Sequence, residues 1–124
     1  VTQTLIFTRL EGKTPVPEGE ALRKLAAHGS AMCIYLSAGD PEGVQRELLA
    51  GGLASSTLAV MAYRVGWPEE KVVETDLASL AHAARDNGFT RQTVFLILPG
   101  QGREDAGKAR SLLYDKDFQH MYRA

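Results

Sequence analysis

Two segments of the sequence hold residue types that could bind a flat, anionic ligand. Tyr63-Arg64-Val65-Gly66-Trp67-Pro68 places an arginine between two aromatic rings, and Tyr35-Leu36-Ser37-Ala38 places a hydroxyl directly after an apolar run. Arginine pairs with carboxylates, and aromatic rings stack on flat groups and on guanidinium ions. A surface turn in which Trp67 is only a packing anchor explains the first segment equally well.

The remaining polar residues predict no catalytic group and no metal site. Gly39-Asp40-Pro41 is explained if Asp40 caps a helix that begins at Pro41. The three histidines are far apart in the sequence, and Cys33 has no second cysteine with which to share a metal. Ser37 lacks the surrounding pattern of a hydrolase nucleophile. We therefore assign no side chain a catalytic role.

Alternating short apolar runs and helical patterns must position the two segments. Strand-sized runs occur at 4–8, 31–36, 57–62 and 93–98, and helical spacing occurs at 17–28, 41–50 and 77–87. Residues 71–74 are either a short strand that pairs back or an early start of the next helix. Both candidate segments follow the ends of strands, where α/β sheets commonly bind ligands.

Length and charge restrict the fold and the partners. The 124 residues suit one α/β domain, and the pattern predicts a three-layer arrangement with a four- or five-stranded sheet flanked by helices. Lysine plus arginine number 14 and aspartate plus glutamate number 15, so neither nucleic acid nor an anionic membrane is expected as a partner. No apolar run approaches the roughly 20 residues of a membrane span. The single cysteine favours a reducing, cytoplasmic setting.

Across almost the whole chain the sequence resembles the precorrin-4 C(11)-methyltransferase family of cobalamin biosynthesis, including its cobalt-precorrin-4 branch. The segments that carry the resemblance are 8–17, 25–29, 32–37, 63–68, 113–115 and 118–120. Together they form a specific match, whereas each alone would be weak.

The resemblance implies an enzyme of two α/β domains with S-adenosylmethionine in the cleft between them. Residues 1–124 would be the C-terminal domain, and the N-terminal domain would be absent. An apolar run that begins almost directly after Val1 also suggests a piece of a longer protein. The sheet would be mixed, which favours residues 71–74 as a strand paired with 57–62.

The resemblance also implies positions for the ligands. Leu36 and Ser37, in a segment similar to tyrosine-methionine-glycine, would contact the cofactor, as would the backbone near Val65. Ile97, on the strand that ends at Leu98, would lie on the adenine side. From their chemistry, Arg64 and Trp67 would face the carboxylates and the ring edge of the tetrapyrrole.

The resemblance implies a methyltransferase that acts on a precorrin, is cytoplasmic and forms a homodimer. Its partners would be the tetrapyrrole substrate and its own N-terminal domain, and the fragment would be inactive alone. A different class of function stays open, namely a self-contained small α/β module for ligand binding or dimerisation without catalysis.

Overall fold

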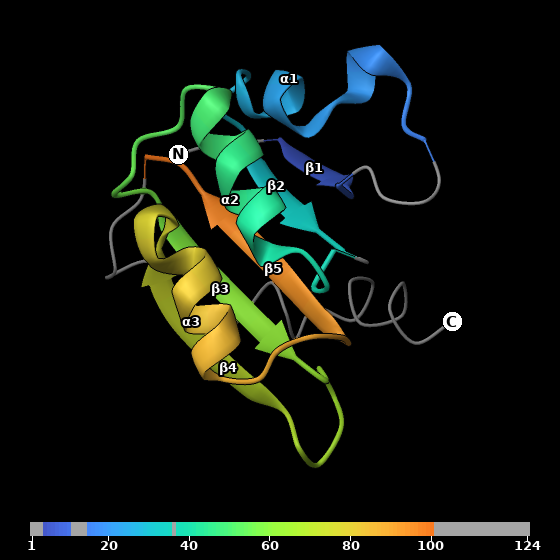
Figure 1. Cartoon of the computed structure of the whole chain (residues 1–124), viewed down its shortest axis with the longest axis vertical. Helices are drawn as coiled ribbons and strands as arrows, with labels where there is room; N and C mark the ends of the chain where they lie inside the picture. Colours follow the sequence, from blue (N-terminus) through green and yellow to red (C-terminus); the bar gives the residue numbers. More distant parts are fainter. Residues whose placement is uncertain (1–3, 11–14, 36, 101–124) are drawn as a thin grey trace.

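The computed structural model of the chain describes residues 4–10, 15–35 and 37–100. These residues form a five-stranded sheet of order β1-β2-β5-β3-β4, with helices packed against it (Figure 1). β1 runs parallel to β2, whereas the β2–β5, β5–β3 and β3–β4 pairs are antiparallel. The strands are β1 Leu5–Thr8, β2 Ala31–Ile34, β3 Leu58–Tyr63, β4 Lys71–Asp76 and β5 Thr93–Leu98. The expected mixed sheet is thus confirmed, and so is the pairing of 71–74 with the preceding strand.

The helices begin and end near the predicted signals. They are the 3₁₀ turns η1 Glu18–Glu20 and η2 Leu77–Ser79, and the helices α1 Leu22–Ala26, α2 Pro41–Ala50 and α3 Leu80–Asp86. Asp40 caps α2 as predicted, because its carboxylate accepts a 3.0 Å hydrogen bond from the Gly43 N–H. No helix within the described ranges is long and apolar enough to cross a membrane.

One predicted helix was wrong as a continuous element. The pattern from residue 17 onward indicated a single helix, but the chain forms η1 and then α1, separated by Ala21 in an extended conformation with φ −56° and ψ 139°. An extended residue cannot continue the i to i−4 hydrogen bonds of an α-helix, so the chain restarts at Leu22. Leu22 and Ala26 are the buried positions of the short α1 that follows.

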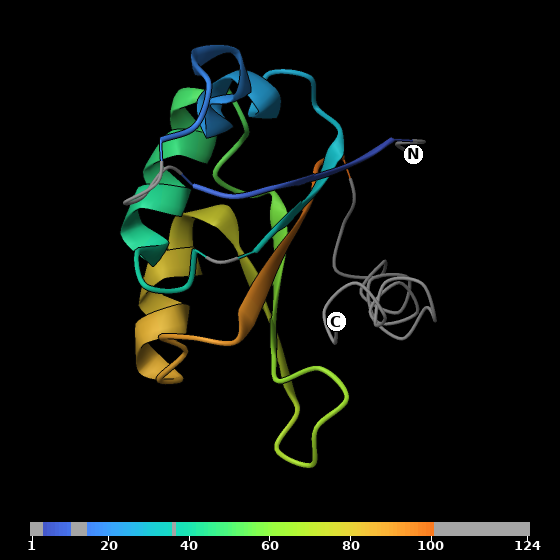
Figure 2. The same ribbon diagram turned by 90° about the vertical axis from the view of Figure 1, so that its right-hand side faces the viewer.

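The two faces of the sheet have different surroundings. Alternate strand residues such as Met61 and Phe95 face the helices and form one buried cluster with helical residues such as Leu48 and Leu80. The other face carries a second cluster, which contains strand residues such as Cys33 and Leu96 but no helical residue. All described helices therefore cover one face of the sheet (Figure 2). The described residues form two layers, where the periodicity alone predicted three.

Candidate functional site

A hollow of about 460 Å³ lies at the ends of two inner strands of the sheet, where β3 ends and β5 begins. We call it the β3–β5 hollow, and its volume is in the range of pockets that bind small ligands. Its lining comes from the loop before α2, the turn after β3 and the connection into β5. The lining residues are Ala38, Gly39, Arg64, Val65, Trp67, Thr90, Arg91, Gln92, Thr93 and Val94.

Arg64 is held rigidly at the wall of this hollow. Its backbone N–H donates to the Gln92 carbonyl at 2.9 Å, and its side-chain Nε donates to Gln92 Oε1 at 2.7 Å. Both residues have left-handed backbones, with φ 47° for Arg64 and 55° for Gln92. Residues with a Cβ rarely adopt this conformation, and such residues gather at functional sites. The double link between two strained residues indicates that the surrounding fold imposes this geometry.

The guanidinium of Arg64 also lies over two aromatic rings. Its central carbon lies 4.8 Å from the ring centroid of Trp67 and 5.3 Å from that of Tyr63. Glu69 lies 3.7 Å from Nη1, and only 21% of the Arg64 side chain is exposed. The charge of Arg64 is therefore partly balanced from within the protein, and its orientation is set by four neighbours.

The turn after β3 presents Trp67 at the surface. Trp67 donates its backbone N–H to the Arg64 carbonyl at 3.0 Å, and its own carbonyl accepts from the Glu70 N–H at 3.0 Å. The Glu70 carboxylate accepts from the Gly66 N–H at 2.9 Å, and Gly66 has a φ of 83°. Trp67 keeps 45% of its surface exposed although it is a large apolar side chain. An exposed indole beside a hollow offers a surface on which a flat ligand can stack.

Two aromatic residues that do not line the hollow, Tyr63 and Phe89, pack together next to it. The Tyr63 and Phe89 rings stack with centroids 5.1 Å apart and planes 10° apart. Phe89 is buried, and its N–H donates to the Ala84 carbonyl at the end of α3. This contact joins the end of β3 to the connection that leads into β5.

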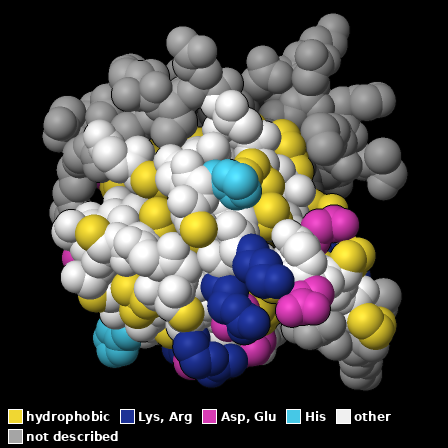
Figure 3. Space-filling model, turned by 90° about the horizontal axis from the view of Figure 1, so that it is seen from above, with side chains coloured by type: hydrophobic (Ala, Val, Ile, Leu, Met, Phe, Trp, Pro, Cys, Tyr) yellow, Lys and Arg dark blue, Asp and Glu magenta, His cyan; other side chains and the backbone are white. Residues whose placement is uncertain are grey.

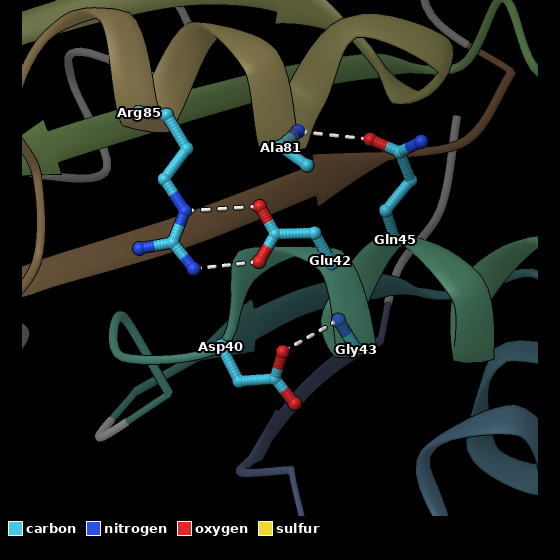
Figure 4. A network of polar contacts seen from close by, with 6 residues as sticks. All are labelled: Asp40, Glu42, Gly43, Gln45, Ala81 and Arg85. Carbon is cyan, nitrogen blue, oxygen red and sulfur yellow. Dashed lines mark hydrogen bonds and ion pairs between the residues drawn. The ribbon is translucent and has the colours of Figure 1, made fainter.

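A polar network fixes α2 against α3, the two helices whose ends border the hollow (Figure 4). Arg85 donates to both carboxylate oxygens of Glu42, from Nε at 2.9 Å and from Nη2 at 2.6 Å. Gln45 Oε1 accepts from the backbone N–H of Ala81 at 2.8 Å. The Arg85 hydrogen bonds lower the pKa of the Glu42 carboxyl, and Glu42 in turn raises the pKa of Arg85. The loop before α2 and the connection after α3 are thereby held at a fixed separation.

The structure brings some of the predicted site residues together and leaves others apart. Arg64, Val65 and Trp67 line the same hollow. Ser37 is buried, and its hydroxyl is engaged internally, since it accepts from the Leu10 N–H at 2.8 Å and donates to the Tyr35 carbonyl at 2.9 Å. A cofactor contact by Ser37 would therefore have to use its backbone.

Of the other two predicted cofactor positions, the structure describes Ile97 alone, and Ile97 does not line the hollow. Leu36 lies outside the described residues. Ile97 is fully buried in the cluster between the sheet and the helices, opposite Met32 and Ala59. Because β5 is antiparallel to β3, Ile97 is near the end of β5 that is remote from Arg64. Thr93 is the β5 residue that pairs with Tyr63.

Sequence reasoning missed the segment 90–94, which contributes half of the lining. Its signal was an arginine-glutamine pair directly before an apolar strand. That signal gains meaning only once β5 is known to be antiparallel to β3, because the start of β5 then lies beside the end of β3.

Charged side chains elsewhere in the described part of the chain pair with neighbours of opposite sign. Among the described residues no group of three or more histidine, cysteine, aspartate or glutamate side chains could hold a metal ion. At the end of the molecule where α1 lies, basic side chains stand next to acidic ones (Figure 3). Arg23 pairs with Glu47 at 3.8 Å, and Lys24 pairs with Glu18 at 3.4 Å.

Several known proteins with sequences similar to this chain are precorrin-4 or cobalt-precorrin-4 C(11)-methyltransferases. The chain is 40% identical, over 99% of its length, to the cobalt-precorrin-4 C(11)-methyltransferases of Methanocaldococcus jannaschii and Priestia megaterium. It is 35% identical to the precorrin-4 C(11)-methyltransferase of Pseudomonas aeruginosa, again over 99% of its length. The matches cover 47%, 48% and 48% of these relatives, so the chain spans about half the length of the curated relatives it matches. No protein-family model matches the chain.

Solved structures show the same fold. The crystal structure of a cobalamin biosynthetic enzyme, a cobalt precorrin-4 methyltransferase, matches 78% of this chain with 41% of its own, at a TM-score of 0.76 and 40% identity. A uroporphyrin-III C-methyltransferase from Thermus thermophilus, complexed with S-adenosylhomocysteine, matches 78% of this chain with 42% of its own. Its TM-score is 0.61 at 14% identity, which is evidence for the fold alone.

Proposed function

We propose that the chain is the C-terminal domain of a cobalt-precorrin-4 C(11)-methyltransferase. The reason is that 99% of its length matches about half of the length of each such relative. The full-length protein would transfer a methyl group to ring carbon 11 of precorrin-4 or of its cobalt complex. This domain would supply one wall of the active-site cleft. The observation that carries the proposal is the 40% identity over 99% of the chain, combined with a ligand-sized hollow at Arg64 and Trp67.

The lining of the β3–β5 hollow is compatible with one side of S-adenosylmethionine. Val65 and Val94 offer apolar surface for a purine, and Thr90 and Gln92 offer hydrogen-bonding groups. We propose that the Val65 backbone, Leu36 and the Ser37 backbone contact this cofactor. Ile97 is proposed to support the adenine side from within the core rather than by direct contact.

The residues of the hollow would act by binding and orientation. S-adenosylmethionine supplies an already activated methyl group, so the protein needs to align the reactants and to exclude water, and orientation alone contributes roughly 7–11 kcal/mol to such reactions. The described residues that line the hollow include no aspartate, glutamate or histidine. Arg64 and Trp67 are proposed to hold a carboxylate and the ring edge of the tetrapyrrole.

The assembly and the location of the enzyme are part of the same proposal. We propose a cytoplasmic homodimer in which the N-terminal domain closes the cleft over this domain. Both the homodimer and the cytoplasmic location are supported by the sequence resemblance to the methyltransferase family.

Calorimetric titration with S-adenosylhomocysteine tests the proposal, using the 124-residue chain and the full-length protein in parallel. Binding by the full-length protein alone supports a cleft built from two domains. Tight binding by the 124-residue chain would favour a self-contained ligand-binding module instead. Absence of binding by either protein would contradict the methyltransferase assignment.

A further inference from the structure

Arg91 lines the β3–β5 hollow and differs from Arg64 in its surroundings. Its side chain is exposed, and among the described residues its guanidinium has no hydrogen bond or ion pair. Its backbone is held, because the Thr93 hydroxyl donates to the Arg91 carbonyl at 2.9 Å. The backbone at Arg91 is thus anchored, while the guanidinium stays accessible to a ligand.

Arg64 is less suited to be the principal anion-binding group of the hollow. Its Nε donates to Gln92, its Nη1 lies 3.7 Å from Glu69, and its central carbon lies over the Trp67 ring. A new carboxylate would have to compete with Glu69 for this guanidinium. Arg91 meets no such competition, because no acidic side chain among the described residues forms an ion pair or hydrogen bond with it.

The position of Arg91 follows from the register of the sheet. Thr93 pairs with Tyr63, and the Arg64 N–H bonds to the Gln92 carbonyl, so the residues before β5 lie alongside the turn after β3. Arg91 therefore adds positive charge to the same hollow that Trp67 and Val65 border with apolar surface. A ligand with a flat apolar body and a carboxylate matches this combination.

We infer that Arg91 is the principal carboxylate-binding residue of the β3–β5 hollow, and that Arg64, whose side chain is fixed in the wall, makes the secondary contact. The inference rests on the proposed function for the identity of the ligand. Two ligands would bring a carboxylate to this place: the aminoacyl end of the methyl donor and an acidic side chain of a tetrapyrrole.

The test compares Arg91→Gln with Arg46→Gln in the full-length protein. Arg46 is an exposed arginine of α2 that does not line the hollow, so its substitution removes the same charge elsewhere. The probes are S-adenosylhomocysteine, methylthioadenosine, which lacks the aminoacyl carboxylate, and uroporphyrin, a stable tetrapyrrole with acidic side chains. Dissociation constants are measured by calorimetry, and circular dichroism checks that each variant is folded.

We expect Arg91→Gln to lower the affinity for one carboxylate-bearing probe by about fivefold. This is the effect expected for loss of a partly exposed, charge-assisted hydrogen bond. Weaker binding of S-adenosylhomocysteine with unchanged methylthioadenosine assigns the carboxylate to the methyl donor, and weaker binding of uroporphyrin assigns it to the tetrapyrrole. Arg91→Lys keeps the charge and should recover part of the affinity.

Two results overturn the inference, and they are distinguishable. If the unaltered protein binds the probes and Arg91→Gln binds them equally well, Arg91 has no such role, while the proposed function stands. If the unaltered protein binds neither S-adenosylhomocysteine nor uroporphyrin, the proposed function fails and the inference fails with it.

Discussion

Replacement of Gln92 by alanine or by glycine separates the contribution of its side-chain hydrogen bond from the cost of its left-handed backbone. Alanine removes the 2.7 Å hydrogen bond to Arg64 Nε but keeps a Cβ on a backbone with φ 55°. Glycine removes the same bond and also relieves the left-handed strain. The two variants therefore share one loss and differ in the backbone conformation that each residue prefers.

The magnitudes follow from these contacts. Loss of the side-chain hydrogen bond should cost about 1 kcal/mol, because net contributions are about 0.5–1.5 kcal/mol and Gln92 is exposed. Relief of left-handed strain is worth roughly 1–2 kcal/mol, and the greater freedom of glycine in the unfolded chain offsets about 0.5–1 kcal/mol of it. Gln92→Gly should thus be about 0.5–1 kcal/mol more stable than Gln92→Ala.

Urea unfolding of the 124-residue chain measures this difference. Trp67 is the single tryptophan of the chain and stacks on Arg64, so its fluorescence reports on the hollow directly. With a slope of about 2 kcal/mol per molar urea, 1 kcal/mol shifts the midpoint by about 0.5 M. A glycine variant less stable than the alanine variant would refute the argument from backbone strain. An alanine variant as stable as the unaltered chain would show that the hydrogen bond to Arg64 contributes nothing.

Three further predictions concern the cap of α2, the α2–α3 network and the hollow. Asp40→Ala should destabilise the fold by about 1 kcal/mol, measured as a fall of roughly 4 °C in the thermal midpoint, whereas Asp40→Ser should keep most of the stability by retaining a capping oxygen. The pKa of Glu42 is lowered from 4.5 by Arg85, so its stabilising effect is present above pH 4.5 and is lost as the pH falls through the lower, folded-state value. Arg85→Gln should raise that pKa toward 4.5 in an NMR titration, and an unchanged value would exclude the hydrogen bonds as its cause. Arg64→Glu should weaken binding of uroporphyrin by the full-length protein about tenfold, with Arg46→Glu as the charge-matched control, and unaltered affinity would rule out Arg64 as part of the substrate site.

Local signals in the sequence were sufficient for several elements. The apolar run at 93–98 became β5 with the same bounds, because six consecutive apolar or β-branched residues suit a strand buried on both faces. Asp40 and Pro41 marked the start of α2, because a capping carboxylate and a fixed proline φ act within one turn. The helical spacing after Pro17 predicted one continuous helix. That prediction was wrong because Ala21 is extended and separates η1 from α1.

The sequence by itself determined the α/β class, the strand and helix signals and the chemistry of Arg64 and Trp67, since all of these depend on residue types within a few positions of one another. Only the tertiary structure decided that Gln92 bonds to Arg64, that Arg91 reaches the same hollow, and that Ser37 is engaged elsewhere. It also decided that Ile97 faces the helices rather than the hollow. The physical reason is that the antiparallel pairing of β3 with β5 joins residues almost thirty positions apart, and the free energy that selects this register comes from burial of the whole sheet face.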